Sequence, residues 1–148
     1  MSFPEYSLRE VEYGSLEYRK AVALRDEVLR KPLGLRISDQ DVEVDARCLH
    51  IVATQGDQII GCLILNPHED GVIQMRQVAV ASGFQGQGIG QALVKFSEKV
   101  ATQQGFRRMI LHARETAVPF YQKLGYTVIG ERFTEVTLPH WEMVKEIG

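Results

Sequence analysis

A glycine-rich segment, Gln85-Gly86-Gln87-Gly88-Ile89-Gly90, is the part of the sequence whose residue types point most directly to chemistry. It follows the apolar run Val78-Ala79-Val80 and leads straight into a helical pattern. No Ser, Thr, Asp or Asn stands within 85–90 to cap that helix, so its first backbone N–H groups need another partner. Glycines let a phosphate approach the backbone, and the helix dipole favours an anion there. The segment therefore predicts a phosphate-binding loop.

Two familiar phosphate-binding loops do not match this segment. The nucleotide-binding P-loop needs a lysine after its last glycine, but Gly88 is followed by Ile89. The dinucleotide-binding pattern would require a third glycine where Gln91 stands. No alternating strand-helix-strand order precedes the loop either, which argues against a nicotinamide-dependent oxidoreductase.

Hydrophobic patterning predicts the elements that position this loop. Short apolar or alternating runs favour strands over residues 6–12, 48–53, 58–65, 72–80, 108–112, 126–130 and 140–144. Helical periodicity follows Ser15, the glycine-rich loop and Thr116, whereas the polar stretch 34–46 is expected to form a loop with a helical turn. Strands and helices are mixed rather than strictly alternating, which indicates an α/β (α+β) fold. Without a linker or repeat, residues 1–148 are expected to form a single domain.

The composition narrows the class of protein. The chain is 45% hydrophobic and 24% charged, as in globular proteins, and its formal net charge of -2 gives no reason to expect nucleic acid or a membrane surface as partner. We expect a cytoplasmic location, because the sequence shows no signal-peptide pattern and no membrane-spanning apolar run. Cys48 and Cys62 lie in apolar runs without metal-ligand spacing, so we expect two small core residues and no metal.

At the loop, the sequence resembles the GNAT superfamily of N-acetyltransferases. The signature of that family, Gln/Arg-x-x-Gly-x-Gly/Ala, is matched by Gln85, Gly88 and Gly90. A second family motif, Asn-x-x-Ala-x-x-x-Tyr followed by Gly and an aromatic residue, is matched over 114–126, with Arg114 in place of the asparagine. The resemblance implies a mixed central sheet of about six to seven strands, flanked by about four helices. Segment 138–143 and the helix around 25–30 look like the ElaA-like branch.

The resemblance also implies that acetyl-CoA is the co-substrate and assigns the residues that bind it. Strand Val78-Ala79-Val80 would bind the pantetheine arm through its backbone, and the glycine-rich loop would hold the pyrophosphate. The residues implied at the coenzyme site are Val78, Ala79, Val80, Gln85, Gly86, Gln87, Gly88, Ile89, Gly90, Arg114, Ala117, Phe120 and Tyr121.

The implied reaction is direct transfer of the acetyl group to a primary amine, of a small molecule or a peptide, in a ternary complex. Tyr121 occupies the tyrosine position of the family, and its phenol, with a pKa near 10, can protonate a departing thiolate whose pKa is near 8.5. We expect Tyr121 to be the general acid. An acyl-CoA-binding sensor or regulatory module without turnover is the alternative.

The base that deprotonates the amine is less sharply defined. His50 on a central strand and His140 after Pro139 are our candidates, because both are expected to face the acceptor pocket. His112, expected beside core residues, and His68, in a turn, are set aside. Four carboxylates are the alternatives, acting directly or through water, namely Glu43, Asp45, Glu131 and Glu135.

The acceptor pocket is expected between the region 13–46 and a loop over 131–140. Homodimers are common among resembling proteins, although nothing in the sequence requires one.

Overall fold

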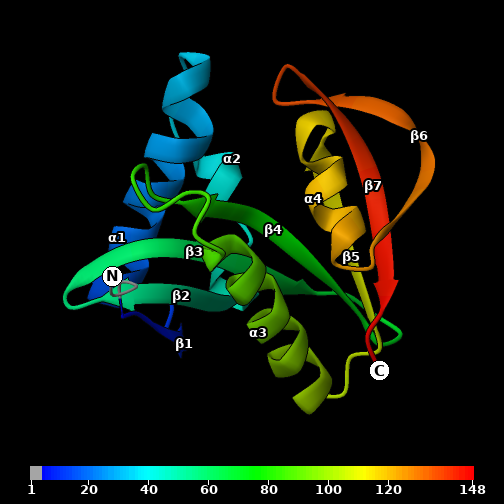
Figure 1. Ribbon diagram of the computed structural model, residues 1–148, viewed down its shortest axis with the longest axis horizontal. Helices are drawn as coiled ribbons and strands as arrows, with labels where there is room; N and C mark the ends of the chain where they lie inside the picture. Colours follow the sequence, from blue (N-terminus) through cyan, green and yellow to red (C-terminus); the bar gives the residue numbers. More distant parts are fainter. Residues whose placement is uncertain (1–4) are drawn as a thin grey trace.

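One mixed sheet of seven strands organises the protein, which is represented by a computed structural model that describes residues 5–148 (Figure 1). The strands are β1 (Ser7–Val11), β2 (Leu49–Gln55), β3 (Gln58–Pro67), β4 (Val72–Val80), β5 (Arg108–Arg114), β6 (Thr127–Glu135) and β7 (Leu138–Glu146). Their order across the sheet is β1-β2-β3-β4-β5-β7-β6. Neighbouring strands are antiparallel except for the parallel pair β4–β5. The expected mixed α/β architecture is confirmed.

Within residues 5–148, four α-helices connect the strands, the number that the resemblance implied. They are α1 (Leu16–Arg25), α2 (Asp39–Val42), α3 (Ile89–Gln103) and α4 (Val118–Lys123). The hydroxyl of Ser15 accepts a hydrogen bond from the backbone N–H of Tyr18 at 3.1 Å, which confirms the predicted cap of α1. A wider π-helical turn over Asp26–Arg30 continues α1, and Gly34, with φ of 71°, ends the segment.

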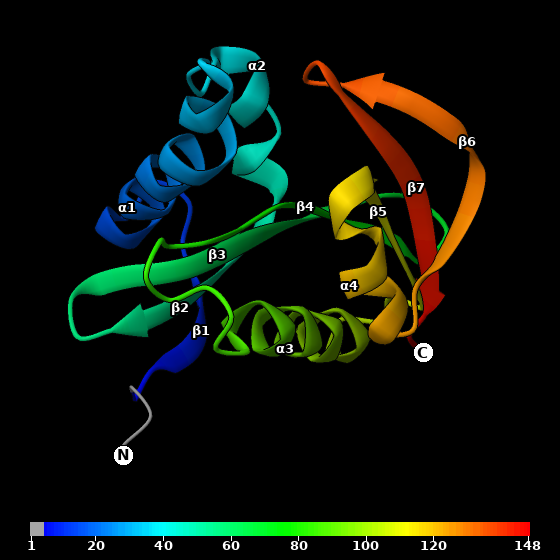
Figure 2. The ribbon, with the colours of Figure 1, turned by 45° about the horizontal axis from the view of Figure 1, so that its top comes forward.

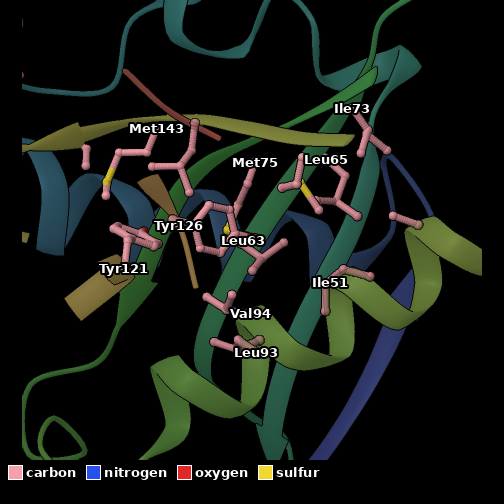
Figure 3. Close-up of a cluster of buried hydrophobic side chains, with 14 of the residues drawn as sticks. Ile51, Leu63, Leu65, Ile73, Met75, Leu93, Val94, Tyr121, Tyr126 and Met143 are labelled. Atoms are coloured by element: carbon pink, nitrogen blue, oxygen red, sulfur yellow. The ribbon is translucent and has the colours of Figure 1, made fainter. Parts of the chain in front are cut away.

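Helices α1 and α3 cover opposite faces of the first half of the sheet (Figure 2). Alternate strand residues explain this arrangement, because Ile51 and Ala53 pack with α3, whereas Val52 between them packs with α1. The α3 side forms the larger core, which extends to Tyr121 and Tyr126 at α4 and to Met143 on β7 (Figure 3). Both cysteines are buried and unpaired, as expected. Among residues 5–148, no helix is long and apolar enough to cross a membrane.

Strands β4 and β5 pair over only part of their length. Their parallel register runs from Val72 opposite Arg108 to Met75 opposite Leu111, although β4 continues to Val80 and β5 to Arg114. A bulge in β4 lies just beyond the last pair, where the register against β3 shifts and Gln77 takes a φ of 54°. The two strands therefore separate into a cleft whose walls are the ends of β4 and β5.

The last hairpin is longer than the sequence indicated. The predicted strand over 126–130 continues as β6 to Glu135, and β7 begins at Leu138, so most of 131–140 is strand rather than loop. Gly130 resembles a strand end in the sequence, but its φ of 72° lies within a register shift between Ile129 and Phe133 that bends β6 without ending it. Val136 and Thr137 both have positive φ, as a two-residue hairpin turn requires.

Candidate functional site

The glycine-rich loop joins β4 to α3 and has the geometry of an anion site. Gly86 and Gly88 have φ of 77° and 84°, and a Cβ atom at either position would meet no atom within 4 Å. Gly88 is the N-cap of α3, and no side chain caps the helix. The first N–H groups of a 15-residue helix and its dipole are thus directed at an open, exposed backbone. These residues fit the pyrophosphate of a coenzyme.

The glutamines of the loop hold its shape. Gln85 Nε2 donates to the carbonyl of Val80 at 3.0 Å, and Gln87 Nε2 donates to the carbonyl of Gly83 at 3.1 Å. Ile89 is buried in the core and anchors the start of α3. The loop is therefore fixed by its own side chains and leaves its backbone for a ligand.

Gly90 lies where α4 meets the start of α3, and a Cβ there would make only ordinary van der Waals contacts. A Cβ at this position would lie 3.5 Å from Cζ of Phe120, whose ring packs over the glycine. Phe120 itself is 37% exposed and meets Tyr121 edge-on, with 4.9 Å between ring centroids. Phe120 thus lies beside the glycine-rich loop and lines neither of the two pockets of the cleft.

The backbone groups of the predicted segment Val78-Ala79-Val80 on β4 do not all point the same way. Ala81 donates its N–H to the carbonyl of Ile60 on β3, and the register pairs Ala79 with Cys62. Because backbone groups alternate in direction along a strand, Ala79 faces β3, whereas Val78 and Val80 face the cleft. Ala79 was expected to bind the coenzyme through its backbone; in the structure its backbone is directed at β3 and its side chain is buried.

An inner pocket of about 140 Å³ lies between the separated ends of β4 and β5. It is lined by Leu29, Arg30, Met75, Gln77, Val78, Leu111, His112, Ala113, Arg114, Ala117, Tyr121, Glu135, Val136 and His140. Two residues with predicted catalytic roles, Tyr121 from α4 and His140 from β7, thus lie in one pocket with the cleft-facing Val78. Burial raises the pKa of Tyr121, so its phenol carries a proton at neutral pH.

His140 is oriented by its own hairpin. Its Nδ1 lies 2.9 Å from the carbonyl of Leu138, which can only accept, so Nδ1 carries the hydrogen. In the neutral ring, Nε2 then holds a lone pair, and this atom lies 3.7 Å from Oε2 of Glu135. The ring is buried, 4% exposed, and can take up a proton at Nε2.

An outer pocket of about 510 Å³ opens from the inner one. The two share Arg30, Met75, Gln77, His112, Glu135 and Val136. The remaining walls of the outer pocket include Gln40, Asp41 and Glu43, so the regions 13–46 and 131–140 meet at this cleft, as the sequence indicated. Arg30 and Asp41 form an ion pair across the wall, with 2.8 Å between Nη2 and Oδ1.

His112 belongs to the cleft, contrary to the expectation that set it aside. Its side chain is 32% exposed, and its Nδ1 lies 3.1 Å from Oε1 of Glu135. That hydrogen bond raises the pKa of His112 and lowers the pKa of Glu135. Strand alternation was the available signal, because Leu111 and Ala113 on either side are buried and direct His112 to the other face.

His50 lies away from the cleft, where we expected it to face the acceptor. The ring is 3% exposed, with Nε2 2.8 Å from the carbonyl of Asp45, and lines neither pocket. Burial lowers its pKa. A histidine on a central strand was taken to face a pocket, but its side of β2 is covered by Tyr18, 4.9 Å away between ring centroids.

Of the four carboxylates considered as bases, two line the cleft and two do not. Asp45 is completely buried and forms an ion pair with Arg25, with 2.8 Å between Oδ2 and Nη1, and therefore cannot reach an acceptor. Glu131 is exposed on β6 and lines neither pocket. Glu43 lines the outer pocket, and Glu135 lines both pockets.

Arg114, at the position of the expected asparagine, bridges two elements. Its Nη2 donates to the carbonyl of Leu29 at 2.8 Å, which connects the end of β5 to the turn that follows α1. Arg114 and Ala117 both line the inner pocket. The guanidinium closes one end of the cleft.

A parallel strand pair thus separates beside a glycine-rich, uncapped helix start, which forms a cleft next to an anion site. The chain belongs to the acetyltransferase (GNAT) family, whose model matches residues 12–126. It is therefore an enzyme that transfers acetyl groups from acetyl-CoA.

Individual relatives agree with this assignment. The uncharacterised N-acetyltransferase YjcF of Bacillus subtilis (strain 168) is 30% identical over 131 residues, 88% of this chain and 93% of the relative. The crystal structure of a protein from Lactobacillus plantarum, described as an N-acetyltransferase, has a TM-score of 0.87 over 96% of this chain and 98% of that one. The two sequences are 28% identical. Escherichia coli ElaA has a TM-score of 0.83 over 96% of this chain and all of its own (100%), and at 20% identity the likeness is one of fold.

Proposed function

We propose that the protein, acting as one domain, transfers the acetyl group of acetyl-CoA directly to a primary amine of a small molecule or peptide. One observation carries this proposal: an inner pocket with Val78, Tyr121 and His140 opens directly into an outer pocket of about 510 Å³. Donor and acceptor thus have separate spaces that adjoin, and the two candidate proton-transferring side chains, Tyr121 and His140, line the inner one. This supports a ternary complex.

The cleft residues match the needs of the reaction. When bound, acetyl-CoA supplies the thioester that the amine attacks. The cleft-facing N–H of Val78 is a donor for the oxyanion that develops, a kind of contact worth roughly 2.7–4 kcal/mol in known cases. An ammonium such as that of lysine has a pKa near 10.4, so the acceptor must lose a proton, and Nε2 of His140 is our candidate to take it. Tyr121, protonated at neutral pH, is our candidate to protonate the thiolate.

Direct transfer is also supported by the position of the cysteines. Cys48 and Cys62 are the two cysteines of the chain, and both are buried outside the two pockets. A buried thiol is a poor nucleophile, because burial raises the pKa of Cys48 to about 11. An acetyl-cysteine intermediate therefore has no candidate residue in the cleft.

The experiment measures thiol release from acetyl-CoA with a panel of primary amines, together with the mass of the products. We expect acetylated amine, initial-rate patterns that intersect, and no acetylated protein when amine is omitted. The Tyr121→Phe variant should lower kcat at least about tenfold with little change in KM for acetyl-CoA. Tyr13→Phe, at an exposed residue away from the cleft, is the matched control.

Two results would count against this proposal. Wild-type turnover by Tyr121→Phe would remove this residue as the acid. Tight binding of coenzyme A with no thiol release on any amine would support the acyl-CoA-binding module instead.

A further inference from the structure

Glu135 lies between two histidines, and each of its carboxylate oxygens faces a different ring. Oε1 is 3.1 Å from Nδ1 of His112, and Oε2 is 3.7 Å from Nε2 of His140. The three residues come from β6, β5 and β7, which the sheet order brings together at the C-terminal edge. Glu135 therefore connects two rings that are 28 positions apart in the sequence.

This chain of side chains extends from one pocket to the other. His140 lines the inner pocket alone, whereas Glu135 and His112 line both pockets. Phe133, two positions before Glu135 on the same face of β6, packs against both rings, at 5.0 Å from His112 and 5.9 Å from His140 between centroids. The aromatic contact holds the two imidazoles on either side of the carboxylate.

The charges around His112 favour a carboxylate beside an imidazolium. Glu135 is the nearest acid, and Glu142 on β7 is the second, with Oε2 3.8 Å from Nε2. Arg76 on β4 opposes them as the nearby cation. Arg30, Asp41 and Glu43 face the group across the outer pocket. The raised pKa of His112 and the lowered pKa of Glu135 both favour an imidazolium that donates its Nδ1 hydrogen to the carboxylate.

We propose that His140, Glu135 and His112 form a proton path from the inner pocket to the mouth of the cleft. This inference rests on the proposed amine acetylation. The net reaction converts an ammonium and a thioester into an amide and a thiol, and so releases one proton per turnover. The amine proton passes to Nε2 of His140 and then to Oε2 of Glu135. His112, now beside a neutral carboxyl, releases its Nε2 proton to water and becomes a neutral ring that still carries its hydrogen on Nδ1. The ring then turns so that its free nitrogen faces the carboxyl, and the proton of Glu135 passes to that nitrogen, which restores the ion pair.

The present distances suit such a path. The Glu135–His112 contact is a hydrogen bond, whereas the 3.7 Å contact to His140 must shorten by somewhat less than 1 Å to become one. Catalytic hydrogen bonds are often long in the absence of substrate and tighten in the reacting complex. His140 keeps the hydrogen bond from Nδ1 to the carbonyl of Leu138 in the meantime, and Glu135 and His112 keep each other as partners.

The test compares Glu135→Gln with Glu131→Gln, the same substitution on the same strand but outside both pockets. An amide cannot accept and pass on a proton. We expect Glu135→Gln to lower kcat about tenfold or more, with KM for acetyl-CoA unchanged, and imidazole added to the assay to restore part of the rate. His112→Asn should show a smaller loss that imidazole also restores. Glu131→Gln should behave as the wild type.

Three outcomes would overturn the path. A wild-type kcat and pH–rate profile in Glu135→Gln would leave amine acetylation intact and remove only the path. If Glu135→Gln loses kcat that imidazole does not restore and also has a lower Tm, Glu135 has a structural role. His112→Asn would then show the same unrestored loss and the same lower Tm. Wild-type protein that acetylates no amine would overturn the proposed function itself, and the path with it.

Discussion

Arg25 Nε donates to Oε1 of Gln77 at 2.5 Å, which joins helix α1 to the bulge of β4. The same guanidinium forms the buried ion pair with Asp45, and Nε2 of Gln77 donates to the carbonyl of Asp41 at 3.0 Å. One network thus holds the acceptor wall around α2 and the strand that presents Val78. The geometry of the bulge therefore depends on a residue that lines neither pocket.

The first prediction concerns the ion pair between Arg25 and Asp45, whose side chains are 1% and 0% exposed. Arg25→Met should reduce the free energy of unfolding by about 3–5 kcal/mol, because it leaves the buried carboxylate of Asp45 without its countercharge. Urea unfolding at neutral pH measures this value. The double variant Arg25→Met with Asp45→Asn should recover part of the loss. A loss below about 1 kcal/mol in the single variant would contradict the argument.

The second prediction concerns the backbone of Gln77, which has a φ of 54°. Gln77→Gly and Gln77→Val both remove the amide side chain, but only glycine adopts this φ without strain. A β-branched residue there costs about 1–3 kcal/mol, and the bulge would relax toward a regular strand. We expect calorimetric titration with coenzyme A to give weaker binding for the valine variant than for the glycine variant. Equal affinities would mean that the bulge does not orient the coenzyme.

The third prediction concerns the charge of the glycine-rich loop. Gln87→Glu is similar in size but adds a negative charge beside the proposed pyrophosphate site and removes the hydrogen bond from Nε2 to the carbonyl of Gly83. Coenzyme A affinity should fall by about five- to tenfold, or about 1 kcal/mol, at low ionic strength. The effect should shrink as salt is added, because the loop is exposed. Gln103→Glu, at the opposite end of α3, should leave the affinity unchanged.

The loop and the element order could be predicted because their signals are local. Glycine spacing, the absence of a cap and the alternation of Val72–Val80 all lie within short stretches of sequence, and β4 has the predicted bounds. Tyr121 was predicted as the acid and His140 as a candidate base from separate segments of the sequence, and the fold brings them into one pocket. Local patterns and the family motif therefore identified Val78, Arg114, Ala117, Tyr121 and His140, but not most of the other residues that line the inner pocket.

The missed features depend on residues that are distant in sequence. Glu135 was among the alternative bases, but its place on a strand was not expected: it lies at the cleft because β6 bends at Gly130 and continues, and only the pairing with β7 shows this. Arg25 resembles an ordinary helix-surface charge until Asp45 covers it. His50 resembles a pocket residue until Tyr18 packs on it. In each case the side chain's role depends on a tertiary neighbour that no local pattern indicates.

The last prediction concerns how stability depends on pH through His112. Its pKa is raised in the folded protein by Glu135, so its stabilising contribution is fully present below the unfolded pKa of about 6.5. That contribution is lost as the pH rises through the raised folded value. For Glu135 the folded pKa is lowered, so its contribution is present above the unfolded pKa of about 4.3 and lost as the pH falls through the folded value.

The Tm difference between wild type and His112→Asn should therefore be largest in the window between about pH 4.5 and pH 6.5, and should narrow toward pH 9. Differential scanning calorimetry at several pH values measures it. In a Glu135→Gln background the same His112→Asn substitution should give a smaller and flatter difference, because the partner that raises the pKa is gone. A difference that grows with pH would show that His112 is stabilised as a neutral ring, and the carboxylate would then not govern its charge.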